Sequence, residues 1–355
     1  MKGKKKDYIL LKIATILIIF IFIFIAQRSF DAYIIRILNL CGIYVILGTS
    51  LNLINGITGQ FSLGHAGFMA IGAYVSALLY MSPESKEVNY FITPLIWPLN
   101  VIQIPFVFSL IMAGLVSSAV GFLVSAPCLR LKGDYLAIVT FGFSEIIRVL
   151  FNNLQNITNG PLGLKGLPSY TNLWWTWGIA VFTVWFIKNL SSSSYGRALR
   201  SIREDEVAAE AMGVKLFYHK VLSFVIGSFF AGVAGALLGS LVMTIDPNTF
   251  TLAMTYQIII IVVIGGLGSI TGTVIVAVIF AVLMEALRSV ESAINLFGFT
   301  IRGIPGMRML LFSILLMVVI LFFQRGLMGT KEWSWEWLYK KLMGNRNKKE
   351  IKEGS

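Results

Sequence analysis

Charged side chains are scarce in this sequence. Only 13% of its 355 residues are Asp, Glu, Lys or Arg, whereas 57% are hydrophobic. A soluble domain carries about 25% charged residues, so this composition excludes a soluble globular enzyme or regulator. The mean hydropathy of +0.80 is that of a protein that crosses the membrane several times.

Side chains for covalent or metal chemistry are also few. The chain has two histidines and two cysteines. The histidines lie far apart in the sequence, and this excludes a metal-ligand cluster of the usual spacing. Cys41 and Cys128 lie in or beside different apolar runs and give no reason to expect a disulfide. No nucleophile has an evident base, so we expect neither an enzyme nor a metal site.

The net charge of +12 is concentrated in short loops and in the tails. That distribution is typical of positive-inside topology and not of nucleic-acid binding. We predict an all-α polytopic fold with about ten membrane helices and both termini in the cytosol. A basic N-terminus (1–7) precedes one transmembrane domain (8–324), and a basic tail that contains tryptophans (325–355) follows it. The ten apolar runs are Tyr8–Ala26, Tyr33–Ile54, Ser62–Met81, Gln103–Ala126, Asp134–Phe151, Leu173–Ile187, Leu222–Met243, Leu252–Ile264, Gly272–Val290 and Met307–Phe323.

The segment Ser191–Lys220 is the only long charged segment between the two ends of the chain. We predict two short helices in it, with Asp205 as the N-cap of the second helix and Gly213 at its C-terminal end. On the second helix, Val207, Ala208, Ala211 and Met212 form an apolar stripe. The helix is too short to cross a bilayer, so a partner or the membrane surface has to cover this stripe. The alternative is an ordinary solvated loop.

Two glycine-rich junctions interrupt the apolar runs, one in Asn52–Tyr74 and one in Gly265–Gly272. Irregular backbone at membrane depth is tolerated only where protein buries it or a wet cavity borders it. Asn52, Ser62 and His65 are candidates to line such a path, and Ser62 is also predicted to cap the following helix. The alternative is that the glycines serve helix packing and His65 is an ordinary core residue. The glycines concerned are Gly56, Gly59, Gly64, Gly67, Gly265, Gly266, Gly268 and Gly272.

Two Glu-x-x-Arg pairs lie within predicted spans, Glu145 with Arg148 and Glu285 with Arg288. A spacing of three places both members of each pair on one helix face, where their charges partly neutralise each other. Ionisable groups in membrane helices are functional candidates, so these pairs either belong to a translocation path or are structural ion pairs.

Four segments resemble the permease subunits of the branched-chain amino-acid ABC importers, the LivH/LivM group. Two of these segments, LRLKGDYLAIVT and YGRALRSIREDE, are more similar to the LivM branch than to the LivH branch. Together the four segments cover most of the chain from Leu51 to Gly329. They are Gly56–Tyr74, Leu129–Asn153 with Ile157–Leu164, Tyr195–Gly239, and Gly265–Gly272 with Arg325–Gly329.

The resemblance implies that the charged central segment docks in a groove of an ATPase subunit. It also implies a LivH-like permease partner, two ATPase subunits that bind ATP and Mg²⁺, and an extracytoplasmic substrate-binding protein. This chain would hold no cofactor and would span the cytoplasmic membrane of a bacterium or archaeon. The residues that would couple to the ATPase are Arg200, Arg203, Glu204, Asp205, Glu206, Ala208, Ala209, Glu210, Met212 and Gly213.

Three other functions remain open at this point. Related permeases carry urea or short amides, and the residues of this chain do not separate those substrates from Leu, Ile and Val. A gradient-driven carrier or channel would work without an ATPase and would not need the central segment. A membrane-embedded enzyme would need a catalytic cluster, which the sequence lacks.

Overall fold

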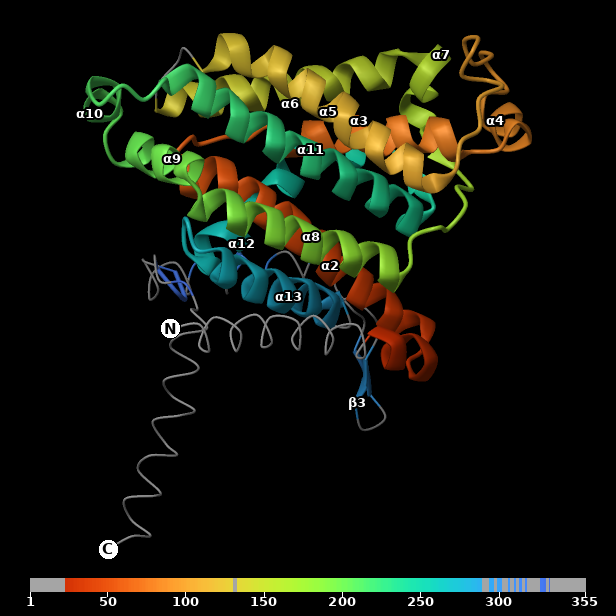
Figure 1. Cartoon of the computed structure of the whole chain (residues 1–355). Helices are drawn as coiled ribbons and strands as arrows, with labels where there is room; N and C mark the ends of the chain where they lie inside the picture. The colour runs from red at the N-terminus through yellow and green to blue at the C-terminus, as the bar shows by residue number, and fades with distance from the viewer. Residues whose placement is uncertain are drawn as a thin grey trace, which may run out of the picture.

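The computed structural model describes residues 23–129, 133–288, 294–296 and 299–301, together with 306, 310, 313, 314, 317, 326–329 and 332. These residues form a bundle of helices with one long axis (Figure 1). The helices are α2 (Ala32–Asn52), continued by the π-helical η1 (Leu53–Ile57), α3 (His65–Tyr80), α4 (Pro83–Asn89), α5 (Phe106–Cys128), α6 (Asp134–Asn153), α7 (Gln155–Thr158), α8 (Leu173–Ser192), α9 (Ser194–Glu204), α10 (Glu206–Ala211), α11 (Leu216–Val242), α12 (Leu252–Gly265) and α13 (Ile270–Ala286). Short 3₁₀ turns, η2 (Gly160–Leu162) and η3 (Pro247–Thr249), and the strands β1 (Leu164–Lys165), β2 (Thr244–Ile245), β3 (Ile294–Leu296) and β4 (Phe299–Ile301) complete the described elements.

Within the described part of the chain, four helices are long and apolar enough to cross a membrane. They span Ala32–Ile57, Phe106–Cys128, Leu216–Val242 and Pro247–Gly265, and α3 and α13 are shorter apolar helices. The helices α6 and α8 have 20 residues each but are less apolar. The predicted all-α membrane architecture is confirmed by these helices.

Each of the eight central apolar runs of the sequence corresponds to one helix of the structure, although the helix ends differ by a few residues from the ends of the runs. The largest shift is at α11, which begins at Leu216 and not at Leu222. Most of the first run and most of the tenth run lie outside the described residues. The count of ten spans and the side on which the termini lie therefore stay predictions.

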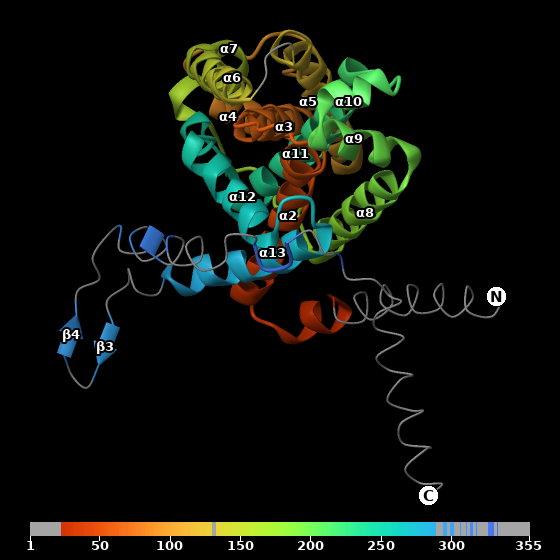
Figure 2. The same ribbon diagram turned by 90° about the vertical axis from the view of Figure 1, so that its left-hand side faces the viewer.

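The long helix α11 packs against α3, α5 and α2 in the middle of the bundle. Figure 2 looks onto the end that carries α10 and shows α5 and α6 on one side of this centre and α13 on the opposite side. The helices α3 and α11 cross where Gly72 meets Gly232 backbone to backbone. The Ser117 hydroxyl of α5 donates to the carbonyl oxygens of Phe68 (3.1 Å) and Ser228 (2.8 Å) and so joins the same three helices. Small residues allow this close approach, as is usual in membrane bundles.

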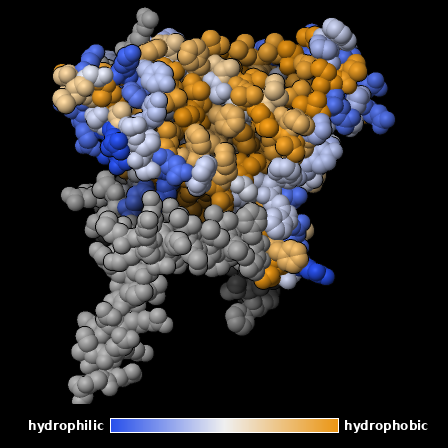
Figure 3. Space-filling view, viewed as in Figure 1, coloured by the Kyte–Doolittle hydropathy of each residue, from blue (hydrophilic) through white to orange (hydrophobic). Residues whose placement is uncertain are grey.

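The two ends of the bundle are polar and differ in structure. One end, here called the α10 end, carries α9 and α10, and the opposite α4 end carries α4 and α7 (Figure 1). Apolar residues cover the middle of the face shown in Figure 3, and hydrophilic residues gather at both ends. At the α4 end, β1 and β2 form a two-residue antiparallel pair, Leu164 opposite Ile245 and Lys165 opposite Thr244. The strands β3 and β4 form a second small antiparallel pair, so the all-α description holds for the bundle and not for every link.

The α3–α11 crossing gives a testable prediction. A methyl group on Gly72 would overlap the Gly232 carbonyl, whereas a methyl group on Gly142 of α6 would have no neighbour within 4 Å. We expect Gly72→Ala to lower the free energy of unfolding by about 1–3 kcal/mol, since overpacking forces the helices apart. Gly142→Ala is the matched control and should be neutral or stabilising by about 0.5–1 kcal/mol. Thermal unfolding in detergent, followed by tryptophan fluorescence, measures both, and equal midpoints for the two variants would contradict the assigned crossing.

Candidate functional site

The two glycine junctions, far apart in the sequence, meet at the α10 end of the bundle. Asn52, the last residue of α2, holds them together with three hydrogen bonds. Its amide nitrogen donates to the Ser269 carbonyl oxygen and to the Thr273 hydroxyl, both at 2.9 Å. Its amide oxygen accepts from the Gly268 backbone N–H at 2.9 Å. Asn52 is fully buried, so these bonds satisfy polar backbone that water cannot reach.

The backbones of the two junctions touch where both sequences have glycine. A Cβ on Gly56 would overlap the Gly268 nitrogen. Gly268 also has φ of +88°, a conformation that favours glycine. The other junction glycines are close-packed as well: Gly59 against Arg203, Gly64 against Thr140, Gly67 against Ser144, Gly265 against Gly272, and Gly266 against Gly329. The predicted packing role of the glycines is therefore what the structure shows.

Arg203 of α9 lies across this glycine contact. Its Nη1 donates to the Gly56 carbonyl oxygen at 2.8 Å, and the same nitrogen lies 2.7 Å from where a Cβ on Gly268 would stand. A Cβ on Gly59 would lie 2.7 Å from Cγ of Arg203. Nη2 pairs with the Glu204 carboxylate at 2.6 Å. The central segment therefore contacts both junctions through one side chain.

The central segment folds locally as its sequence predicts. The Asp205 carboxylate accepts from the backbone N–H groups of Val207 (2.8 Å) and Ala208 (3.1 Å) and caps α10. Gly213 has φ of +84° just after the helix. The stripe is exposed, with Val207 72% and Met212 85% accessible, and Ala208, Glu210 and Ala211 are exposed as well. An exposed apolar stripe at the tip of the bundle is a candidate surface for a partner.

The prediction that Ala209 contributes to that contact surface is wrong. Ala209 is only 4% exposed, because it lies on the face of α10 that is turned toward the protein. A side chain there supports the helix and is not accessible to a partner.

An ion pair joins α10 to the long helix α11. The Glu206 carboxylate lies 2.5 Å from Nζ of Lys220, whose side chain is only 8% exposed. Because a buried ammonium needs a compensating charge, this pair fixes the position of α10 relative to α11. No local pattern in the sequence predicts this pair, because Glu206 and Lys220 are 14 positions apart.

A segment near the C-terminus completes the α10 end. The Leu327 backbone N–H donates to the Ile264 carbonyl oxygen at 2.7 Å. The Glu332 carboxylate accepts from the Ile270 N–H, in the first turn of α13, at 2.9 Å. A carboxylate is favourable at a helix N-terminus, so Glu332 anchors the start of the tail to α13.

The polar residues predicted for a translocation path are buried within the protein. Asn52, Ser62 and His65 are at most 1% exposed. His65 Nε2 shares a hydrogen bond of 2.9 Å with the Ser50 hydroxyl. Neither His65 Nδ1 nor the side-chain amide of Gln60 has a partner among the described residues.

The prediction that Ser62 caps the following helix is wrong. The N-cap is Gly64, and α3 begins at His65. The Ser62 hydroxyl instead accepts a long hydrogen bond of 3.4 Å from the Gly64 N–H.

Both Glu-x-x-Arg pairs form ion pairs. Glu145 and Arg148 are 2.6 Å apart on α6. Glu285 of α13 lies 3.2 Å from Arg288, which follows the end of that helix. Figures 1 and 2 place α6 and α13 on opposite sides of the bundle, so the structure does not bring the two pairs together.

The Asn52 contact gives a second prediction. Asn52→Leu keeps the side-chain size but leaves the Gly268 N–H without its acceptor. We expect the free energy of unfolding to fall by about 1–3 kcal/mol, since an unsatisfied buried donor costs that much. Asn153→Leu is the control, because the Asn153 amide at the end of α6 donates only to the Val149 carbonyl oxygen and is exposed. Thermal unfolding should separate the two variants, and an unchanged midpoint for Asn52→Leu would disprove the role of Asn52 in joining the junctions.

The sequence of the chain is similar to that of several permease proteins of branched-chain amino acid transport systems. The permease protein LivM of the high-affinity branched-chain amino acid transport system of Salmonella typhimurium is 35% identical over 69% of this chain and 61% of its own length. LivM of Escherichia coli K12 is 34% identical over 72% of this chain and 63% of its own length. The chain thus matches less than two thirds of the length of these two relatives. A probable LivM of Methanocaldococcus jannaschii is 27% identical over 85% of this chain and 95% of its own length. No solved structure matches the chain.

The family profile covers a larger part of the sequence than the two enterobacterial relatives do. The family described as branched-chain amino acid transport system, permease component, matches residues 33–324. This range contains both glycine junctions, the central segment and every helix from α3 to α13. The predicted resemblance is confirmed, and the chain belongs to this family of permease components.

Proposed function

We propose that the chain is the membrane-spanning subunit of an ABC importer for Leu, Ile and Val. The observation that carries the proposal is the exposed apolar stripe of α10 at the tip of the helix bundle. The chain's membership in the permease family gives this stripe its interpretation. Apolar side chains with flanking carboxylates suit a helix-in-groove contact with another protein. The groove would belong to an ATPase subunit, which would bind ATP and Mg²⁺, and this chain would hold neither.

The proposed topology has ten spans, with residues 1–7, the α10 end and the tail 325–355 in the cytosol. The positive charge of the central segment and tail supports this orientation. The α4 end would then face the outside of a bacterial or archaeal cytoplasmic membrane and meet a substrate-binding protein. A LivH-like permease would be the second membrane subunit, and substrate would pass near the polar groups Asn52, Ser62 and His65. Buried polar groups without partners, such as the Gln60 amide, need water or a solute, and this supports a path there.

The contacts of the central segment support a route for the mechanical signal. The Glu206–Lys220 pair ties α10 to α11, which packs against α3 and α5. Arg203 ties α9 to Gly56 and lies against Gly268, at the junctions that lead into α3 and α13. A displacement of α10 by the ATPase would therefore reach both groups of helices at once. In this proposal it switches the permease between inward-open and outward-open states.

The docking surface is tested by Val207→Glu in the complete transporter. An unpaired carboxylate in an apolar groove costs more than about 1.4 kcal/mol, so ATPase binding and ATP-driven leucine uptake into proteoliposomes should fall at least about tenfold. The matched control is Val88→Glu. Val88 is 76% exposed and also lies on a short helix, but at the α4 end. It should leave ATPase binding unchanged, which co-purification measures.

The same assay separates the alternatives. ATP-driven uptake of urea or acetamide without leucine uptake would support an ABC importer but would show that its substrate is not leucine. Leucine uptake by the chain alone, driven by an ion gradient, would contradict the ABC importer and support a secondary carrier. Equal ATPase binding by both glutamate variants would show that the stripe is not the docking surface.

The signal route is tested by Arg203→Gln. Arg203 does not belong to the exposed stripe, so the ATPase should still bind and hydrolyse ATP. Transport per ATP hydrolysed should fall by about tenfold, because the hydrogen bond from a charged donor to Gly56 is lost and contributes roughly 1.5–3 kcal/mol. The control is Arg197→Gln on an exposed position of the same helix. Equal transport-to-hydrolysis ratios in the two variants would disprove the role of Arg203.

A further inference from the structure

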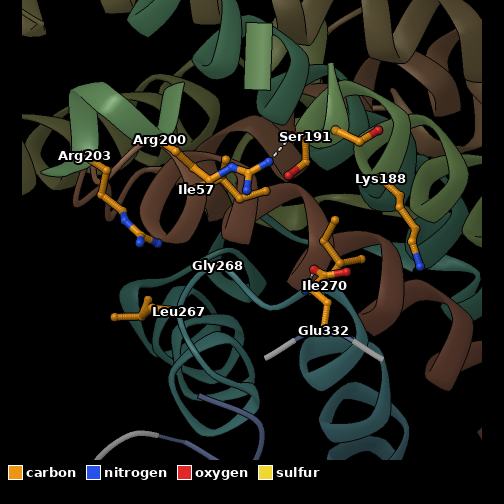
Figure 4. A pocket seen from close by; sticks show the side chains of 10 residues that line it. Ile57, Lys188, Ser191, Arg200, Arg203, Leu267, Gly268, Ile270 and Glu332 are labelled. Carbon is orange, nitrogen blue, oxygen red and sulfur yellow. Dashed lines mark hydrogen bonds between the residues drawn. The ribbon is translucent and has the colours of Figure 1, made fainter. Parts of the chain in front are cut away.

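A cavity of about 340 Å³ lies beside the glycine contact at the α10 end. Its volume falls in the range of about 300–1,000 Å³ that is typical of small-molecule sites. Helices α8 and α9, the second glycine junction and the tail segment contribute its wall (Figure 4). The wall residues are Ile57, Lys188, Ser191, Ser192, Arg200, Arg203, Leu267, Gly268, Ile270 and Glu332.

The cavity is cationic. Lys188, Arg200 and Arg203 carry positive charge, and Glu332 is the single acidic residue of the wall. Arg203 is already paired with the Glu204 carboxylate, so Lys188 and Arg200 are the wall cations without a carboxylate partner in the part of the chain that the structure describes. Glu332 already accepts from the Ile270 N–H. Its carboxylate is therefore directed to the first turn of α13.

The Lys188 and Arg200 side chains keep donors available. Lys188 has no hydrogen-bond or ion-pair partner among the residues that the structure describes. Arg200 donates from Nε to the Gly196 carbonyl oxygen at 3.4 Å and from Nη2 to the Ser191 carbonyl oxygen, and both acceptors are neutral. In Figure 4 the Arg200 guanidinium lies next to Ser191, and the Lys188 side chain lies farther along the cavity wall. Cationic donors without a carboxylate, next to hydroxyl groups, are the chemistry that binds phosphate oxygens.

We propose that this cavity binds a phosphate group, held by Lys188 and Arg200 with the Ser191 and Ser192 hydroxyls. The group belongs either to an anionic membrane lipid or to a free phosphate. The helix α8 lines the cavity with residues near its C-terminal end. The same helix also has an exposed apolar surface, where Phe182 and Trp185 are 50% and 56% exposed. Tryptophan is enriched at the membrane interface, and basic pockets at the ends of membrane helices bind lipid headgroups. The proposal does not depend on the identity of the transported substrate.

Native mass spectrometry of the full-length protein tests the site. The chain is purified after exchange into phosphatidylglycerol or phosphatidylcholine, and retained lipid is counted. We expect retention of phosphatidylglycerol over phosphatidylcholine, and a loss of about tenfold or more in the double variant Lys188→Gln/Arg200→Gln, since two cationic donors are removed. The charge-matched control is Arg197→Gln/Lys215→Gln, two exposed positions outside the cavity. It should retain the lipid as the parent does.

A competition arm distinguishes the two sources of phosphate. If excess inorganic phosphate does not displace phosphatidylglycerol, the site takes a lipid. If the parent and the control bind inorganic phosphate, measured by calorimetry, and the Lys188→Gln/Arg200→Gln variant does not, the site takes a soluble phosphate. Equal losses in the two double variants, or no binding of either ligand, would overturn the proposal. Thermal unfolding of each variant shows that a loss of ligand is not a loss of fold, because Lys188 and Arg200 are not core residues.

Discussion

The α10 end of the structure depends on one contact, that of Gly56 with Gly268. Two irregular turns can meet backbone to backbone only where neither carries a side chain, and only where their polar groups find partners within the protein. Asn52 supplies those partners to the second turn. The first turn follows a π-helical end of α2, the segment η1. Such a wide turn in a membrane helix releases carbonyl groups from the regular pattern, and one of these, on Gly56, accepts from Arg203.

That contact explains why a charged loop can be coupled to an apolar bundle. A carbonyl inside a regular helix already accepts one backbone N–H, so an arginine that reached it would share the acceptor instead of having a free one. The irregular junction provides one, and the missing Cβ atoms of Gly59 and Gly268 provide the space for the guanidinium. The second link of the loop is of a different kind, since Lys220 of α11 is buried and paired with Glu206. A neutral backbone acceptor holds one side of the loop and an ion pair holds the other.

The sequence was sufficient for features that depend on near neighbours. The Asp205 cap, the turn at Gly213 and the apolar stripe of α10 each follow from a few consecutive residues, and the eight central helices follow from runs of hydrophobic residues. Features that depend on distant residues could not be predicted. Arg203 and Gly56 are 147 positions apart, and Asn52 and Thr273 are 221 apart. The predicted role of Ala209 was wrong for a related reason: helical periodicity places residues on a face, but it does not say which face the rest of the protein covers.

The charged side chains also differ in whether their partners are near or distant in the sequence. Arg148 on α6 and Arg288 just after α13 each pair with a carboxylate three residues earlier in the sequence, so each of these charges is neutralised by a near neighbour in the chain. At the α10 end, Arg200 bonds to carbonyl oxygens and Arg203 to both a carbonyl and Glu204, while the Glu332 carboxylate is directed to the N-terminus of α13. Carbonyl groups satisfy the donors of a guanidinium but do not cancel its charge. Arg200 therefore keeps its positive charge at this end of the bundle, and this is the charge that the proposed phosphate group would balance.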